Sequence, residues 1–418
     1  MIKIGMPTVY INNGKAYLTA DVHIPTEAAL RYQQLTKTLK NCPWRTGKDY
    51  PPKAWENGRA KLYFEVDKKY ADCLCTERSD AFVIAIFWYA MVTGEDISFE
   101  TPMSERLYLG LTERLIPALG TDPYRPIRLT GPVSSEKSEC RGAVGTGMTC
   151  GIDSFYTLRT HKLTHLAYYE SGHIFHLKGV LDDDASIEEY YQKAYEIADE
   201  KAASAAEIAR QSGLEMIYIK TNHDENLYRG GIIYRSMYSS LSCSLAVQKL
   251  FGTYISSSSG HGGDLKTGLI VPTQNYENLL CESCRTQTLA YVSSDYAKRF
   301  QKSEKLADDR LAAQYLDVCF NFGEKNCGEC YGCLKTMVVL DQLGKLDNFG
   351  KVFDLRKYYS ARRKYIKILA DGAWRPEMGS LRESWTDIVK YAKTQSGELC
   401  DIISELDGED ENGRIIHQ

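Results

Sequence analysis

A glycine-rich stretch, residues 143–158, constrains the fold of this 418-residue chain more than any other feature. Its apolar first half is typical of a buried strand, Thr149-Cys150-Gly151 marks a turn, and a helix is expected to begin at Asp153 and Ser154. A strand that leads through a glycine turn into a helix presents backbone N–H groups and the positive end of a helix dipole. The stretch therefore predicts a phosphate-binding turn. It differs from a Walker A loop because no lysine follows the last glycine.

Strands and helices alternate from residue 140 onward. The expected strands span 141–149, 164–170, 215–221, 252–257 and 315–320. The expected helices begin at Asp153, span 186–212 (with a capping box, Ser186-Ile-Glu-Glu189) and 234–250, begin at Lys298, and follow Cys333. This alternation predicts an α/β fold with a doubly wound parallel sheet, in which ligands bind beyond the carboxyl ends of the strands. The residues expected at those ends are Gly151, Ser171, Asn222 and Ser258.

The sequence favours three domains. Residues 1–132 are expected to form an N-terminal α/β accessory domain, with a hairpin at Asn12-Asn13-Gly14, a strand at 61–66 and helices at 79–91 and 103–119. This part carries no chemical motif, so we interpret it as a substrate- or partner-binding surface. Residues 136–345 form the expected core domain. Residues 346–418 form a helical extension that includes a basic-aromatic helix (356–367) and ends in an acidic tail.

Composition excludes several classes of protein. A net charge of -4 and a pI near 6.1 argue against a general nucleic-acid or membrane-surface binder. The apolar run at 81–92 is shorter than the roughly 20 residues that a membrane span needs, so it predicts a buried helix. The N-terminal residues lack the apolar region of a secretory signal. We therefore expect a cytoplasmic protein; a homodimer is compatible with the sequence.

Four cysteines form the sharpest chemical signal. Cys327, Cys330 and Cys333 follow each other at Cys-x-x-Cys spacing, and Cys319 lies eight residues upstream of Cys327. Four thiolates in this pattern predict a closed, structural Zn²⁺ site. An iron–sulfur cluster and a set of buried free thiols are the alternatives. A second pair, Cys281-Glu-Ser-Cys284, is a weaker candidate for a metal or redox site.

Together these motifs resemble a known family. The Thr149-Cys-Gly-Ile-Asp-Ser154 turn resembles the Ser-Gly-Gly-x-Asp-Ser signature of PP-loop ATP pyrophosphatases, an adenine nucleotide alpha-hydrolase-like fold. The cysteine array, within Asn326–Met337, resembles the zinc loop of one branch, the 7-cyano-7-deazaguanine synthases (QueC). Arg299-Phe-Gln-Lys302 is similar to a basic segment of larger QueC-like proteins. The resemblance covers about residues 140–345 and implies ATP, Mg²⁺ and Zn²⁺ as cofactors.

The resemblance also implies roles for individual residues. ATP would be held by Thr149, Cys150, Gly151, Asp153 and Ser154. Asp153 would coordinate Mg²⁺ or act as a plain helix cap. Arg299 and Lys302 would neutralise charge on pyrophosphate or lie on a solvated helix face. Cys150 departs from the family because it stands where glycine lets the backbone approach pyrophosphate, so a degenerate, inactive loop is an alternative.

Two loops complete the expected site. Residues 256–264 are placed to shield an activated intermediate from water. His261 in this loop is either a general base or a loop histidine without a role. The acidic run 182–184 is expected to cap the helix that follows rather than to bind metal.

The function that the resemblance implies is ATP-dependent ligation. The chain would adenylate 7-carboxy-7-deazaguanine and transfer it to an amine of a partner protein, as is thought for QueC-like proteins of bacterial anti-phage defence, including type IV CBASS. One alternative is a 7-cyano-7-deazaguanine (preQ0) synthase of queuosine biosynthesis. Others are a tRNA-modifying ligase or thiolase, with Cys150, Cys281 or Cys284 carrying sulfur, and an inactive binding module.

Overall fold

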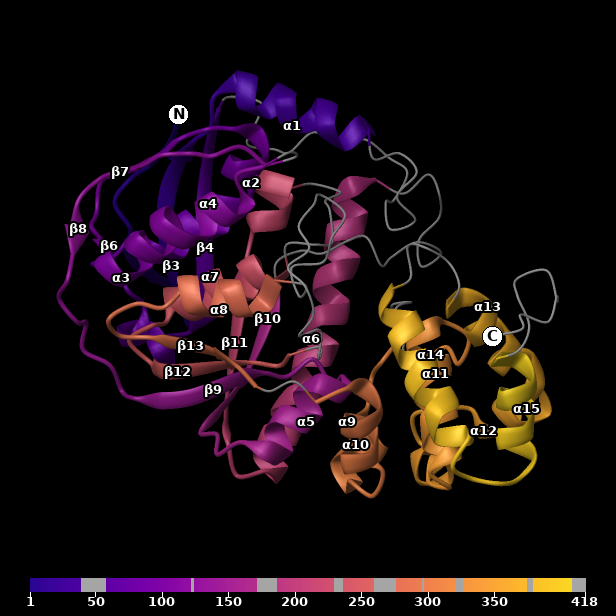
Figure 1. The fold of residues 1–418 in the computed structure, drawn as a ribbon. Coiled ribbons are helices and arrows are strands. Elements are labelled where there is room, and N and C mark those ends of the chain that lie inside the picture. The colour runs from indigo at the N-terminus through magenta and orange to yellow at the C-terminus, as the bar shows by residue number, and fades with distance from the viewer. Residues whose placement is uncertain are drawn as a thin grey trace. The chain divides into compact units, whose positions relative to one another are not determined.

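The computed structural model divides, by its internal contacts, into two compact units (Figure 1). The sheet unit comprises Met1–Met148, His161–Ser258 and Gly262–Ser294, and the helical unit comprises Thr149–Thr160, Ser259–His261 and Asp295–Gln418. The residues described below are 1–38, 58–121, 124–170, 186–228, 236–258, 276–294, 297–319, 326–373 and 379–407. Ser171, the 182–184 acidic run, Ser259 onward in the 256–264 loop and the acidic tail beyond Asp407 lie outside them.

Five strands form the parallel half of the sheet. Their spatial order is β13 (Ala290–Ser293), β12 (Phe251–Ser256), β9 (Ala143–Gly147), β10 (His165–Glu170) and β11 (Glu215–Thr221). All four pairings are parallel. The chain thus proceeds outward from β9 in one direction through β10 and β11, and then in the other through β12 and β13. This order is doubly wound, and its switch point lies at β9, whose carboxyl end leads into the turn at 149–151.

The N-terminal strands continue this same sheet. Beyond β11 follow β4 (Arg59–Asp67), β3 (Lys15–His23), β1 (Ile2–Ile4), β5 (Ile97–Phe99) and β7 (Leu129–Thr130), while β2 (Thr8–Asn12) pairs with β3 as the expected hairpin. Among the described residues the sheet has eleven strands and is mixed, because β4 joins β11 in antiparallel orientation. A separate pair joins β6 (Met103–Ser104) to β8 (Val133–Ser134). The α/β class is confirmed.

Asn222 explains how the two halves of the sheet connect. Its side chain accepts a hydrogen bond from Tyr63 N–H (3.0 Å) and donates one to Lys61 C=O (2.9 Å). Asn222 follows β11 directly, so its amide extends the β11–β4 ladder by one step. Asn222 lies at the carboxyl end of β11, where the strand–helix alternation predicts ligand-binding residues, but its amide is engaged by the β4 backbone. By internal contacts, residues 132–136 lie inside the sheet unit and residues 345–346 inside the helical unit.

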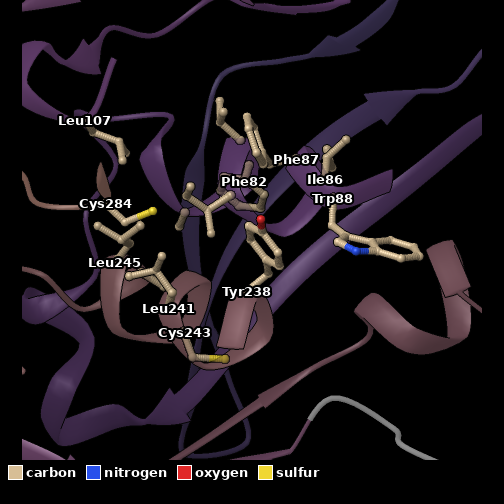
Figure 2. Close-up of a cluster of buried hydrophobic side chains, with 14 of the residues drawn as sticks. Phe82, Ile86, Phe87, Trp88, Leu107, Tyr238, Leu241, Cys243, Leu245 and Cys284 are labelled. Atoms are coloured by element: carbon tan, nitrogen blue, oxygen red, sulfur yellow. The ribbon is translucent and has the colours of Figure 1, made fainter. Parts of the chain in front are cut away.

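A buried helix forms the centre of the sheet unit. In α2 (Asp80–Thr93) every side chain is buried, which agrees with the buried helix expected from the apolar run. Figure 2 shows Phe82 and Phe87 of α2 facing Tyr238 and Leu241 of α7 (Ser236–Ala246). A fully buried Phe contributes about 1.5–3 kcal/mol of transfer free energy. Within the described part of the chain, no helix is long and apolar enough to cross a membrane.

The helix expected at 103–119 is built from several pieces. After β6 it runs as α3 (Glu105–Leu109), a π-helical segment (Gly110–Leu115) and α4 (Ile116–Leu119). Gly110 approaches the backbone of Ser283 so closely that an added Cβ would lie 2.0 Å from the Ser283 carbonyl oxygen. The remaining helices of this unit are α1 (Thr26–Thr38), α6 (Ile187–Gln211) and α8 (Glu277–Ser283). The capping box expected at Ser186 and Glu189 is present at the start of α6.

Among its described residues, the helical unit contains one α-helix from the middle of the chain and seven from its C-terminal part. They are α5 (Ile152–Thr160), α9 (Arg299–Leu306), α10 (Arg310–Tyr315), α11 (Tyr331–Gln342), α12 (Leu355–Ser360), α13 (Arg362–Ala373), α14 (Gly379–Ala392) and α15 (Glu398–Asp407). α11 packs against α9, α13 and α14, and α5 packs against α9. The C-terminal extension is helical as expected, but it shares this unit with α5, α9 and α11.

The strand expected at 315–320 is wrong over its described residues. Tyr315 ends α10, which Asp309 caps by accepting a hydrogen bond from Ala312 N–H, and residues 316–319 have no regular structure. Their backbone is instead bonded to side chains: Val318 N–H donates to Asn326 Oδ1 (2.9 Å), and Cys319 N–H donates to Asp317 Oδ1 (3.2 Å). The fifth parallel strand is β13, a four-residue segment too short to stand out in the sequence.

Candidate functional site

Three predicted site residues meet at the start of α5. Lys302 Nζ donates a hydrogen bond to Asp153 Oδ1 (3.0 Å), and Arg299 Nη2 lies 3.3 Å from Asp153 Oδ2. Both cations lie on α9, one helical turn apart, and both point to the same carboxylate. Lys302 is fully buried and its ammonium lies 5.5 Å from the ring centroid of Tyr156. Lys302 therefore does not belong to a solvated helix face.

The charges of this cluster are unbalanced. Burial alone would raise the pKa of Asp153, but Arg299, Lys302 and Lys335 outweigh it and hold that pKa below its ordinary value. Burial, followed by repulsion from Arg299, lowers the pKa of Lys335 on α11 to about 7. The positive charge of these three basic side chains therefore exceeds the negative charge of the one carboxylate near them. A polyanion entering this cluster would gain attraction from cations whose charge Asp153 neutralises only in part.

The preceding turn has a strained backbone. Cys150 has φ +60°, which is a left-handed conformation that L-residues other than glycine, asparagine and aspartate rarely adopt. Its side chain is buried, and its carbonyl accepts a hydrogen bond of 2.8 Å from Asp317 N–H. The position thus has the backbone conformation that glycine favours, although cysteine occupies it.

The other turn residues are placed differently. Thr149 is exposed. The hydroxyl of Ser154 donates to Gly151 C=O (2.9 Å), so it closes the helix start rather than pointing to a ligand. A Cβ added at Gly151 would lie 3.5 Å from Thr149 Oγ1 and 3.8 Å from Asp317 O, which are ordinary contacts. A Cβ at position 151 would therefore fit without a clash.

The four predicted cysteines come together in the helical unit. The sulfurs of Cys319, Cys327, Cys330 and Cys333 all lie within 4.8 Å of one another. Cys330 Sγ lies 3.5 Å from Cys333 Sγ and 4.0 Å from Cys319 Sγ, and Cys327 Sγ lies 4.0 Å from Cys333 Sγ. A tetrahedral zinc with Zn–S bonds of about 2.3 Å separates its sulfurs by roughly 3.8 Å. The cluster can hold a metal ion, and its geometry is compatible with zinc.

The backbone around the cluster also suits thiolate ligands. The N–H groups of Glu329 and Cys330 point to Cys327 Sγ at 3.4 and 3.3 Å, and Gly328, which follows Cys327, has φ +73°. Such N–H···S contacts stabilise a negatively charged sulfur. The hydrogen bond with Cys330 raises the pKa of Cys319 to about 12. A cation is therefore needed if these crowded thiols are to ionise together.

Three residues of the site had no role in the sequence-based prediction. Asn326 ties the cysteine loop together, because it donates to Leu316 C=O and Val352 C=O (2.8 and 3.1 Å) and accepts from Val318 N–H. Asp317 joins the turn at Cys150 to Cys319. Lys335 is the third cation near Asp153. Only Lys335 left a recognisable signal: it is a lysine within the otherwise mostly apolar start of α11.

The second cysteine pair has a different environment. Cys281 and Cys284 lie at the end of α8, and both are buried in the sheet unit. Burial raises the pKa of both thiols well above the ordinary range. Neither is therefore poised as a thiolate for metal binding or sulfur transfer.

Comparisons with protein-family models, with curated proteins and with solved structures give no match for this chain.

Proposed function

We propose that this chain is an ATP-dependent ligase of the QueC type, which forms AMP and pyrophosphate and creates a carbon–nitrogen bond. Its acid substrate would be a 7-deazaguanine-type carboxylate, 7-carboxy-7-deazaguanine. The observation that carries the proposal is the convergence of Arg299 and Lys302 on Asp153 at the start of α5. The helix start adds backbone N–H groups without intrahelical partners, which favour a phosphate.

Each residue has a distinct role in this proposal. Arg299 and Lys302 bind the phosphates of ATP and stabilise the charge that grows on pyrophosphate as it leaves. The turn of Thr149, Cys150 and Gly151 leads the backbone past the phosphates, and the absence of a side chain at Gly151 lets them approach the backbone there. Asp153 would hold Mg²⁺ once Arg299 and Lys302 have turned from this carboxylate to the phosphates, and the ion would supply positive charge to phosphate oxygens.

The reaction balances without any further reactant. A carboxylate oxygen of the substrate forms a bond to the α-phosphorus of ATP, while the bond from that phosphorus to the departing pyrophosphate breaks. The amine nitrogen then bonds to the activated carbonyl carbon. The C–O bond to AMP breaks, and the nitrogen loses a proton to solvent.

We propose Zn²⁺ as the metal of the four-cysteine cluster. Four thiolates fill a tetrahedral coordination sphere and leave no position for a substrate, so the site is structural. Cys319, Cys327, Cys330 and Cys333 would hold the loop between α10 and α11, and with it the start of the helix that carries Lys335.

The amine in this proposal belongs to a partner protein in anti-phage defence, as the resemblance to type IV CBASS proteins suggests. With ammonia as the amine, the same activation would make an amide. A second ATP would then adenylate the amide oxygen, which would leave with AMP as the nitrogen loses two protons and the nitrile preQ0 forms. The buried, high-pKa thiols of Cys281 and Cys284 weigh against a sulfur-transferring tRNA enzyme that uses this pair.

Pyrophosphate release tests the activation step. Purified protein is incubated with ATP and Mg²⁺, with and without 7-carboxy-7-deazaguanine. We expect release that depends on the acid in the wild type and is lost in Lys302→Met. Lys305→Met is the matched control, since Lys305 is exposed on the same helix. No acid-dependent release from the wild type would refute the proposal.

Product mass then identifies the amine. With ammonia present, a nitrile product supports preQ0 synthesis. An amide that accumulates, or a mass increase on a protein encoded in the same operon, supports conjugation to a partner.

A further inference from the structure

Asp317 contacts both the phosphate turn and the metal loop. Its backbone N–H donates to Cys150 C=O at 2.8 Å. Two residues later, Cys319 N–H donates to the carboxylate of Asp317 at 3.2 Å. Cys319 is itself one of the four clustered cysteines. One residue thus connects the carbonyl of the turn to a candidate metal ligand by two hydrogen bonds.

The turn has a physical need for this support. Cys150 occupies a left-handed conformation (φ +60°) that its own side chain disfavours, so contacts from elsewhere must hold it. The segment that supplies the contact, residues 316–319, has no regular structure of its own. Its position depends on side-chain bonds within the cysteine loop, including those of Asn326 to Leu316 and Val318.

We propose that Asp317 is a positioning residue through which occupation of the four-cysteine site sets the conformation of the turn at 149–151. A metal bound by Cys319 fixes the backbone at 317–319. That backbone holds the Cys150 carbonyl and with it the left-handed turn. Loss of the metal frees Cys319, and the turn relaxes. The coupling is reciprocal by thermodynamic linkage, so a ligand that holds the turn also slows release of the metal.

Cys150 reports on the turn, because its side chain is buried in the structure and relaxation of the turn would expose it. The metal-loaded protein and a chelator-treated sample are alkylated with iodoacetamide, and each cysteine is followed by peptide mass spectrometry. Cys400 in α15 is also buried, so it serves as the internal control for unfolding of the helical unit. We expect chelation to speed alkylation of Cys150 roughly five- to tenfold, the worth of one net hydrogen bond, while Cys400 stays protected.

Variants of Asp317 separate coupling from general stability. Asp317→Ala with metal bound should already show the faster alkylation of Cys150. Asp317→Asn, which keeps an acceptor oxygen for Cys319 N–H, should behave as the wild type. Glu329→Ala is the matched control: this carboxylate belongs to the same loop but is exposed and pairs with Lys357.

Two results would overturn the proposal. One is alkylation of Cys150 that chelation leaves unchanged, and the other is alkylation that rises in step with that of Cys400.

The significance of the coupling for catalysis rests on the proposed function, and a second experiment tests that part alone. In it, pyrophosphate should slow the transfer of metal to a chromogenic chelator in the wild type but not in Asp317→Ala. Failure of this experiment together with metal-dependent alkylation of Cys150 would reject the anion site and leave the coupling standing.

Discussion

Lys302 donates a hydrogen bond of 3.0 Å to Asp153 while its own side chain is fully buried. A buried ammonium is costly unless it is paired, and here the partner is the first acidic residue of α5. Arg299 reaches the same carboxylate from one turn earlier on α9. The pair thus links two helices and at the same time assembles a cationic site.

Replacing Lys302 by Met should weaken both stability and anion binding. Removal of the fully buried Lys302 leaves the half-buried carboxylate of Asp153 with Arg299 and the nearby Lys335, and breaking such an ion pair costs about 3 kcal/mol when other cations remain. Urea unfolding measures the loss, and calorimetry with pyrophosphate measures the binding. Lys305→Met should change neither by more than about 0.5 kcal/mol. Equal effects of the two substitutions would contradict the assigned role of Lys302.

At position 150, glycine should give a more stable protein than alanine, which is the reverse of the usual order of stability. In ordinary conformations alanine is the more stabilising residue, but at φ +60° a Cβ costs roughly 1–2 kcal/mol. We therefore expect Cys150→Gly to be more stable than Cys150→Ala by about 1 kcal/mol. Thermal unfolding of the two variants checks this. A Cys150→Gly variant that loses acid-dependent pyrophosphate release despite normal stability would show that the thiol itself has a function.

Replacing Cys330 by Ser should remove the metal and destabilise the helical unit. Cys330 is the N-cap residue of α11, and serine is a favoured N-cap, so the capping of the helix cannot account for a loss. We expect metal content to fall from about one ion per chain to a small fraction, with a lower unfolding temperature. Elemental analysis and calorimetry measure the two quantities.

Cys284→Ser is the control for that experiment, because it makes the same substitution at a buried thiol outside the cluster. It should retain the metal. A Cys330→Ser protein with unchanged metal content would contradict the four-cysteine site.

Low pH should remove the contribution of the Asp153 carboxylate to the stability of the folded protein. Its pKa is lower in the folded protein than its ordinary value, since Arg299 and Lys302 outweigh the effect of burial. A carboxyl of this kind contributes stability that is complete above its unfolded pKa, about 3.9, and is lost as pH falls through the folded value. Asp153→Asn should therefore be less stable than the wild type near neutral pH, and the difference should vanish in strong acid.

Chemical unfolding across the acid range measures how the difference in unfolding free energy between wild type and Asp153→Asn declines. Asp308→Asn is the comparison, because Asp308 pairs with Lys345 on the surface, where the expected effect is within about 1 kcal/mol at every pH. A difference between Asp153→Asn and wild type that stays constant down to strong acid would contradict the role of the charge.

Local patterns were enough to predict much of this molecule. The four parallel strands β9 to β12, the capping box of α6 and the cysteine cluster each depend on residues close together in sequence. What could not be predicted depends on distant partners. Asn222 continues the ladder of β4, a strand more than a hundred residues upstream, which is why the boundary near 132 does not interrupt the sheet. The link from Asp317 to Cys150 is likewise a backbone bond that no side-chain pattern signals.

The placement of residues 149–160 within the helical unit has a consequence for the order in which the protein is made. Asp153 and Lys302 are separated by 149 residues, so α5 leaves the ribosome long before α9 and α11, the helices on which its partners lie. During that interval the glycine turn and the buried face of α5 await their packing partners, and closure over so long a loop is slow. The nascent chain can thus complete the turn at 149–151 only after the cysteine loop has been synthesised, which makes that turn one of the last parts of the fold to mature.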